Sequence, residues 1–114
     1  MKTHCAGDTL VVSGIKELDA ATARALRQAV STAWSDELKY IEIDLAETVF
    51  MDSFGLGALV WLRKLAADRD GRVRLLNPAP STEQILALTR LYRVFDIVRR
   101  QQAVAREGAS LSLL

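Results

Sequence analysis

The chain has 114 residues, of which half are hydrophobic and a quarter are charged, and its formal net charge is +1. This composition is typical of one globular domain, residues 1–114, that is large enough to bury a core. The near-neutral charge gives no electrostatic reason to expect direct binding to nucleic acid. No run reaches the roughly 18 apolar residues of a membrane span, so direct membrane binding is not expected either. The polar N-terminus, MKTHCAGD, lacks the apolar segment of a signal peptide, and we therefore expect a cytoplasmic protein.

Segments with strand-like composition alternate along the chain with segments of helical periodicity. Strands are expected at residues 9–15, 40–45, 72–76 and 95–98. Helices are expected after Asp19, at residues 54–68, from Ser81 onward, and in the tail 99–114, ending near Gly108. This alternation favours a sheet with parallel neighbours, helices packed on it and right-handed crossovers.

Polar residues at the element boundaries refine these expectations. Asp19 stands where a helix N-cap belongs, and Ser81 with Gln84 three residues later resembles a capping box. In the segment 40–45, Glu42 and Asp44 alternate with apolar residues, so we expect them on a solvated strand face.

The segment FMDSFG joins the second expected strand to the second expected helix. Either Asp52 or Ser53 can cap that helix, which is worth about 1 kcal/mol. A serine at this place is also accessible to the active site of another protein, and a phosphate there adds about −1.5 to −2 charges. Free amides and the helix dipole would tolerate that charge, so the fold would survive while the surface changed. Gly55 and Gly57 cost about 1 kcal/mol each in a helix interior, which indicates close approach by a neighbouring strand or by a partner.

The second helix has more apolar residues than one buried face needs. Phe54, Val60 and Trp61 remain after the sheet-facing positions are assigned, and Phe54 and Trp61 are two turns apart on a similar side. They form either an exposed partner surface or part of the core, buried by helix rotation or by the third helix.

Catalytic motifs are missing from the sequence. The single cysteine, Cys5, excludes an internal disulfide and a thiolate-rich metal site, and the single histidine, His4, has no second imidazole with which to share a metal. Ser53 lacks a G-x-S-x-G elbow, and no phosphate-binding glycine loop occurs. We expect a protein that is not an enzyme and that uses no cofactor or metal of its own.

Several segments together resemble the STAS domain, named for sulfate transporters and anti-sigma factor antagonists. They are ELDAATA, IEIDLAETVFMDSFGLGAL, RVRLLNPAPSTEQILALT and LYRVFDI, and they span about residues 9–98. The most specific part is the D-S-x-G-L pattern at residues 52–56. The resemblance implies an α/β fold with a small mixed sheet of four to five strands and about four α-helices largely on one side. It also allows a first strand before residue 9.

The resemblance to the anti-sigma factor antagonists implies a phosphorylation cycle at Ser53. The unmodified protein would bind an anti-sigma factor that is also a serine-protein kinase, and a sigma factor would be released. The kinase would then phosphorylate Ser53, and the complex would dissociate. A metal-dependent serine phosphatase would restore the hydroxyl. ATP and metal belong to these partners, and a homodimer is possible. The residue patterns and the resemblance together give the expected partner-binding residues, which are Asp19, Asp52, Ser53, Phe54, Gly55, Leu56, Gly57 and Trp61.

Two positions depart from the family pattern, and two other functions stay open. Phe54 follows the serine where a small or polar residue is common, and Arg90 stands where a glycine is common. Small STAS proteins also serve as non-catalytic subunits of bacterial ABC-type lipid transport systems, or as scaffolds in stress-sensing complexes.

Overall fold

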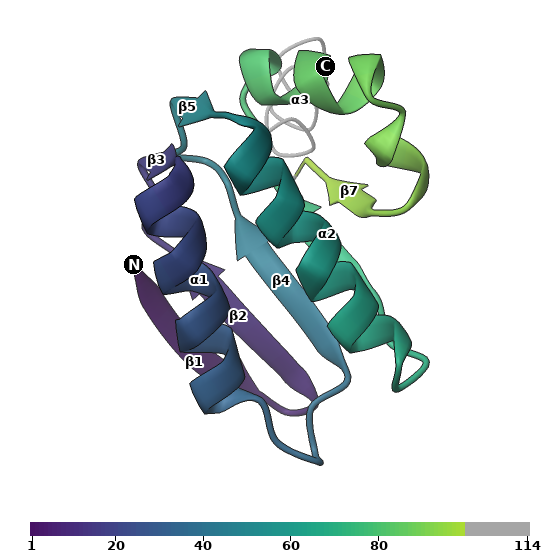
Figure 1. Cartoon of the computed structure of the whole chain (residues 1–114). Coiled ribbons are helices and arrows are strands. Elements are labelled where there is room, and N and C mark those ends of the chain that lie inside the picture. The colour runs from purple at the N-terminus through teal and green to yellow at the C-terminus, as the bar shows by residue number, and fades with distance from the viewer. Residues whose placement is uncertain (100–114) are drawn as a thin grey trace, which may run out of the picture.

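A five-stranded mixed sheet forms the centre of the computed structural model, which describes residues 1–99 (Figure 1). The strand order across the sheet is β1 (Lys2–Ala6), β2 (Thr9–Ser13), β4 (Tyr40–Asp44), β6 (Val73–Leu76) and β7 (Asp96–Val98). β1 is antiparallel to β2, and every other neighbouring pair is parallel. The expected mixed sheet is confirmed, including a strand before residue 9.

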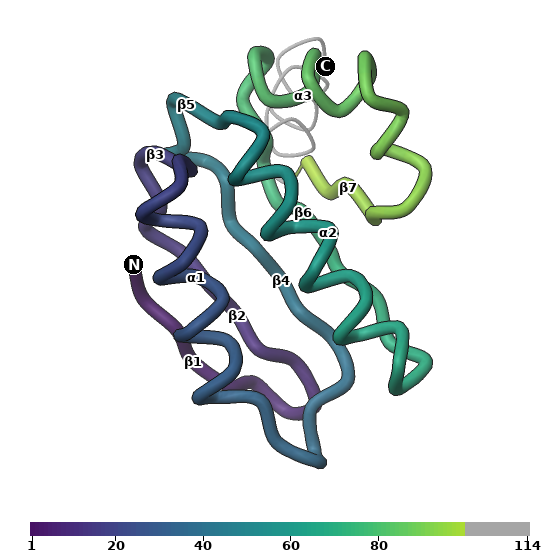
Figure 2. The backbone as a smooth tube through the Cα atoms, in the orientation of Figure 1, coloured from purple at the N-terminus to yellow at the C-terminus, as the bar shows by residue number. Residues whose placement is uncertain are grey.

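The helices gather on one side of this sheet. They are α1 (Ala20–Ala33), α2 (Ser53–Ala67), α3 (Pro80–Leu88) and the 3-10 turn η1 (Leu91–Arg93). Figures 1 and 2 show α1 and α2 side by side over the strands, with α3 at one end of the molecule. Residues 1–99 thus contain three α-helices rather than about four. The expected fourth helix falls in residues 100–114, outside the described part of the chain.

The core lies between the sheet and the two covering helices. Alternate residues of the central strands point to this side, and the helices contribute residues spaced three or four apart. The fully buried side chains include Leu10, Val12, Leu26, Val30, Ile41, Ile43, Ala58, Leu59 and Leu62. The alternation in the segment 40–45 therefore predicted correctly that Ile41 and Ile43 lie on the buried face of β4.

A second, very small sheet joins the beginnings of α1 and α2. It consists of β3 (Glu17–Leu18) and β5 (Phe50–Met51), which pair in parallel. The Val49 N–H also donates to the Lys16 carbonyl at 2.8 Å. Two-residue strands are too short for a pattern of alternation, so the sequence did not predict them. Their pairing fixes the entry to α2 beside the entry to α1.

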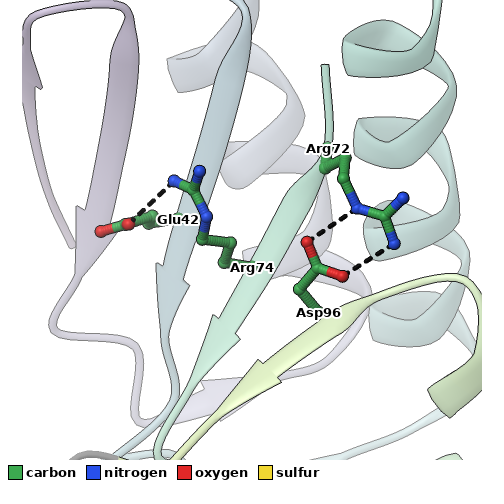
Figure 3. Close-up of polar contacts among 4 residues, drawn as sticks. All are labelled: Glu42, Arg72, Arg74 and Asp96. Atoms are coloured by element: carbon green, nitrogen blue, oxygen red, sulfur yellow. Dashed lines mark hydrogen bonds and ion pairs between the residues drawn. The ribbon is translucent and has the colours of Figure 1, made fainter. Parts of the chain in front are cut away.

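Paired charges lie on the face of the sheet opposite α1 and α2. Arg74 donates a hydrogen bond to Glu42 at 3.1 Å, and Arg72 donates two hydrogen bonds of 2.7 Å each to the carboxylate of Asp96 (Figure 3). The bonds from Arg72 lower the pKa of Asp96 below its usual value. The Glu42 side chain is only 15% exposed. The prediction of a solvated face was thus wrong for Glu42, because the neighbouring Arg74 covers it.

The start of α3 differs from the prediction. Ala79 is the N-cap residue and forms no side-chain cap bond, Pro80 is the first helical residue, and Ser81 lies inside the first turn. The capping box of Ser81 and Gln84 is therefore wrong. Proline explains the earlier start, because its fixed φ suits the first helical position and the N–H that it lacks needs no partner there.

Arg90 adopts a left-handed backbone conformation with φ of +59°, directly after α3. A side chain in this conformation costs about 1–2 kcal/mol, whereas glycine adopts it freely. We expect Arg90→Gly to raise the free energy of unfolding by about 1 kcal/mol, measured by urea denaturation. Arg93→Gly, in η1 where φ is not positive, should lower it. An equal loss in both variants would contradict this explanation.

Candidate functional site

The first turn of α2 is closed by the side chain of Asp52. One carboxylate oxygen accepts from the amides of Phe54 at 2.9 Å and Gly55 at 3.1 Å. The Asp52 carbonyl accepts from Leu56 at 3.0 Å, and the Asp52 N–H donates to Leu18 at 3.3 Å. Of the two residues that could cap this helix, Asp52 is therefore the one that does so. The side chain of Ser53 contributes no hydrogen bond to this cap.

Ser53 is the first residue of α2, and it is exposed. Its hydroxyl forms no hydrogen bond with the described residues 1–99. The side chain therefore has no part in capping, in the core or in a polar network of this part of the fold. A group attached to its oxygen would point to solvent or to a bound molecule.

A close backbone contact brings the N-cap of α1 to the same end of the fold. Gly55 is buried against Leu18, whose carbonyl oxygen would lie 2.3 Å from a Cβ at this position. Asp19 follows Leu18 directly and caps α1 by accepting from the Thr22 amide at 3.0 Å. That hydrogen bond lowers the pKa of Asp19. The two capping carboxylates thus stand at neighbouring helix starts; the sequence predicted the cap at Asp19 and left the second cap open between Asp52 and Ser53.

Three exposed apolar side chains surround Ser53 along the chain. Val49 is 74% exposed, Phe50 is 49% exposed and Phe54 is 62% exposed. We call these three residues the apolar patch. The sequence prediction included only Phe54. Phe50 belongs to β5, whose two residues are too few for a pattern of alternation, so no signal in the sequence marked Phe50 as exposed.

The remaining predicted site residues are less accessible. Leu56 and Trp61 are half-buried and pack against the core, and Gly57 is half-buried near the Arg27 side chain. Trp61 packs against the core because it lies one turn after buried Ala58 on the same side of the helix. Phe54 lies one turn before Ala58, in the first turn of the helix, and stays exposed. The exposed apolar side chains near Ser53 in the chain are therefore those of Phe54, Phe50 and Val49 rather than that of Trp61. Any direct contact of Gly55, Leu56, Gly57 or Trp61 with a partner stays a prediction.

Two further properties of residues 1–99 bear on the kind of site. No group of three or more histidine, cysteine, aspartate and glutamate side chains in this range could hold a metal ion. Within the same range, no helix has both the length and the apolar character needed to cross a membrane. The arrangement around Ser53 offers a hydroxyl, a capped helix start and an apolar surface, which are features of a protein-binding site.

Comparison with known proteins agrees with this architecture. The STAS domain family model matches residues 1–104. The anti-sigma factor antagonist SpoIIAA in its unphosphorylated form is 24% identical with a TM-score of 0.75, over 95% of this chain and 96% of that chain. A putative anti-sigma factor antagonist from Thermotoga maritima is also 24% identical, with a TM-score of 0.80 over 93% of this chain and 92% of that chain.

Two further proteins extend the comparison. An anti-sigma factor antagonist from Mycobacterium paratuberculosis is 28% identical with a TM-score of 0.73, over 85% of this chain and 82% of that chain. A STAS-domain containing protein of Pseudomonas aeruginosa (strain UCBPP-PA14) is 26% identical over 91 residues, which are 80% of this chain and 89% of that protein. The family model covers nearly the whole chain, and the fold is the same. The chain belongs to the STAS domain family.

Proposed function

We propose that the protein is an anti-sigma factor antagonist, switched off by phosphorylation of Ser53. The observation that carries this proposal is an exposed hydroxyl with no bond to the described fold, next in the chain to exposed Phe54 and three residues after exposed Phe50. A partner that covers the apolar patch would also cover the hydroxyl. Binding and modification would then compete for one surface.

The electrostatics of the first turn explain why a phosphate at Ser53 would oppose binding yet spare the fold. The positive end of the α2 dipole favours the added charge. Asp52 already occupies the amides of Phe54 and Gly55, so the phosphate would not displace the cap. Its dianion would instead face any partner seated on the apolar patch, and burying an unpaired charge there is costly.

Comparison with SpoIIAA supports the tolerance of the fold to modification. Structures of SpoIIAA in its unphosphorylated and phosphorylated forms resemble this chain with TM-scores of 0.75 and 0.70. Each is 24% identical to this chain, so these likenesses concern the fold alone.

The proposed cycle assigns the chemistry to other proteins. An anti-sigma factor with serine-protein kinase activity binds the free hydroxyl form and releases its sigma factor. It then transfers phosphate from ATP to Ser53, and a metal-dependent serine phosphatase removes it. The chain is ligand and substrate, not enzyme, and it acts in the cytoplasm with these partners.

Pulldown from the native organism's lysate tests the proposal with three forms of the protein: wild type, Ser53→Ala and Ser53→Asp. We expect wild type and Ser53→Ala to capture an ATP-binding kinase of the anti-sigma type, and Ser53→Asp to lose it. Both variants should keep the wild-type circular dichroism spectrum, because Asp52 provides the cap. If all three forms capture the same ABC-transporter ATPase equally, the protein is a transporter subunit and the proposal is wrong.

A further inference from the structure

Within residues 1–99, β1 forms an edge of the main sheet that no other segment covers. It is the first strand in the sheet order, and all five of its residues are exposed. Natural proteins protect such edges with very short strands, charged side chains, proline, bulges, inward charges or covering segments. β1 contains no proline, pairs with β2 through five consecutive residues without a bulge, and has a single lysine at its start. The other edge, β7, has three residues, all of them half-buried.

The hairpin between β1 and β2 determines which backbone groups of β1 are free. Its two-residue loop, Gly7 and Asp8, closes on the pair Ala6 and Thr9, and Gly7 has φ of +63°. Such loops close on a hydrogen-bonded pair, and bonded and non-bonded pairs then alternate along the strands. Lys2, His4 and Ala6 therefore bond to β2, and the backbone groups of Thr3 and Cys5 point away from the sheet.

The next strand agrees with this assignment. The Asp8 carbonyl accepts from the amides of Lys39 at 2.8 Å and Tyr40 at 3.1 Å, on the β4 side. Even-numbered residues of the β2 segment thus face β4, which leaves odd-numbered residues to face β1.

We propose that two copies of this chain pair through their β1 strands, antiparallel around a two-fold axis at His4. In this register Thr3 of each copy faces Cys5 of the other, so that all outward N–H and C=O groups of these two residues find partners. Lys2 faces Ala6 of the second copy, so the lysines of the two copies do not oppose each other. Lys2 also lies beside the turn that holds Asp8 of the second copy, which supplies an opposite charge on both sides of the axis.

The proposed interface is a weak, concentration-dependent one, because one pair of five-residue strands buries little surface. It joins the two sheets into one continuous sheet and uses no residue of the apolar patch or Ser53. Its failure would therefore leave the proposed phosphorylation switch untouched, and the reverse also holds.

Sedimentation equilibrium of the full chain up to about 1 mM protein tests the proposal, since weak interfaces associate only at such concentrations. We expect the weight-average mass to rise from monomer toward dimer. Cys5→Pro should weaken association at least about tenfold, because it removes an outward N–H while β2 loses no bond. Cys5→Ala, the matched control, should associate as wild type does. A wild type that stays monomeric, or a folded Cys5→Pro variant that associates equally, would overturn the proposal.

Disulfide formation tests the register and does not depend on the folding of the proline variant. In a Cys5→Ala background, His4→Cys should form a covalent dimer under mild oxidation, because the paired Cα atoms at the axis lie about 4.5 Å apart. Lys2→Cys in the same background should not form a covalent dimer. In this register position 2 of one copy faces position 6 of the other, so the two cysteines would lie four residues apart along the strands, about 13 Å. Equal cross-linking of both variants would exclude this pairing.

Discussion

Replacing Gly71 with alanine is expected to lower the free energy of unfolding by about 3 kcal/mol, the upper range for overpacking a core position. A Cβ at this position would lie 1.6 Å from the carbonyl oxygen of Lys39 and 2.6 Å from its carbonyl carbon. The obstacle is backbone, so rotation of a side chain cannot relieve it. Urea denaturation followed by circular dichroism measures the loss.

Neighbouring contacts hold both segments and prevent an easy shift. The Gly71 N–H donates to Ala66 at 2.8 Å, and the Lys39 N–H donates to Asp8 at 2.8 Å. Arg69 holds the same two segments together. It donates a hydrogen bond to the carbonyl of Leu38 at 2.9 Å, and its guanidinium lies over the Trp34 ring, 4.7 Å from the ring centroid. The collision must therefore be relieved by moving a whole loop.

Gly7→Ala is the control that separates the cost of a steric collision from the cost of a left-handed backbone conformation. Gly7 has φ of +63° and no atom within 4 Å of an added Cβ, so the variant should lose only about 1 kcal/mol. Equal losses at Gly7 and Gly71, or a Gly71→Ala variant as stable as wild type, would show that the contact with Lys39 is not what requires glycine.

Gly55→Ala is expected to lower the free energy of unfolding by about 2–3 kcal/mol and to weaken partner binding as well. Its Cβ would lie 2.3 Å from the Leu18 carbonyl oxygen and 2.7 Å from Leu18 Cγ. Relief requires the first turn of α2 to move away from β3, which would displace Ser53 and Phe54 together. Urea denaturation and the pulldown described above measure the two effects.

Gly57→Ala is the matched control two residues later in the same helix. The nearest atom to its Cβ would be Nη2 of Arg27 at 3.5 Å, an ordinary contact with the end of a flexible side chain. Alanine should therefore raise the free energy of unfolding by about 0.5–1 kcal/mol through its better helix propensity. If both variants lose stability equally, close approach to Leu18 does not explain Gly55.

The sequence predicted those features that depend on neighbours in the chain. Asp19 was placed at a helix start, where its carboxylate accepts a backbone N–H, and the cap of α2 was narrowed to Asp52 or Ser53. The features that were missed depend on distant segments. Glu42 is covered by Arg74, and β5 is a strand only because β3 lies beside it.

The same distinction applies to the candidate site. The D-S-x-G-L pattern pointed to Ser53, and the surplus of apolar residues in the helix pointed to Phe54; both are exposed. Exposure of Val49 and Phe50 depends on how β5 leaves the small sheet, which no local pattern records. The inward turn of Trp61 likewise depends on the depth at which α2 packs on the sheet.

The most direct test of the switch is to compare the affinities of the unphosphorylated and the Ser53-phosphorylated protein for the captured anti-sigma factor, by isothermal titration calorimetry. We predict at least about a hundredfold weaker binding after phosphorylation, since an unpaired charge in a closely packed interface costs several kcal/mol. The melting temperature of the isolated protein should change little, because the Asp52 cap stays in place. Equal affinities of the two forms would contradict the account.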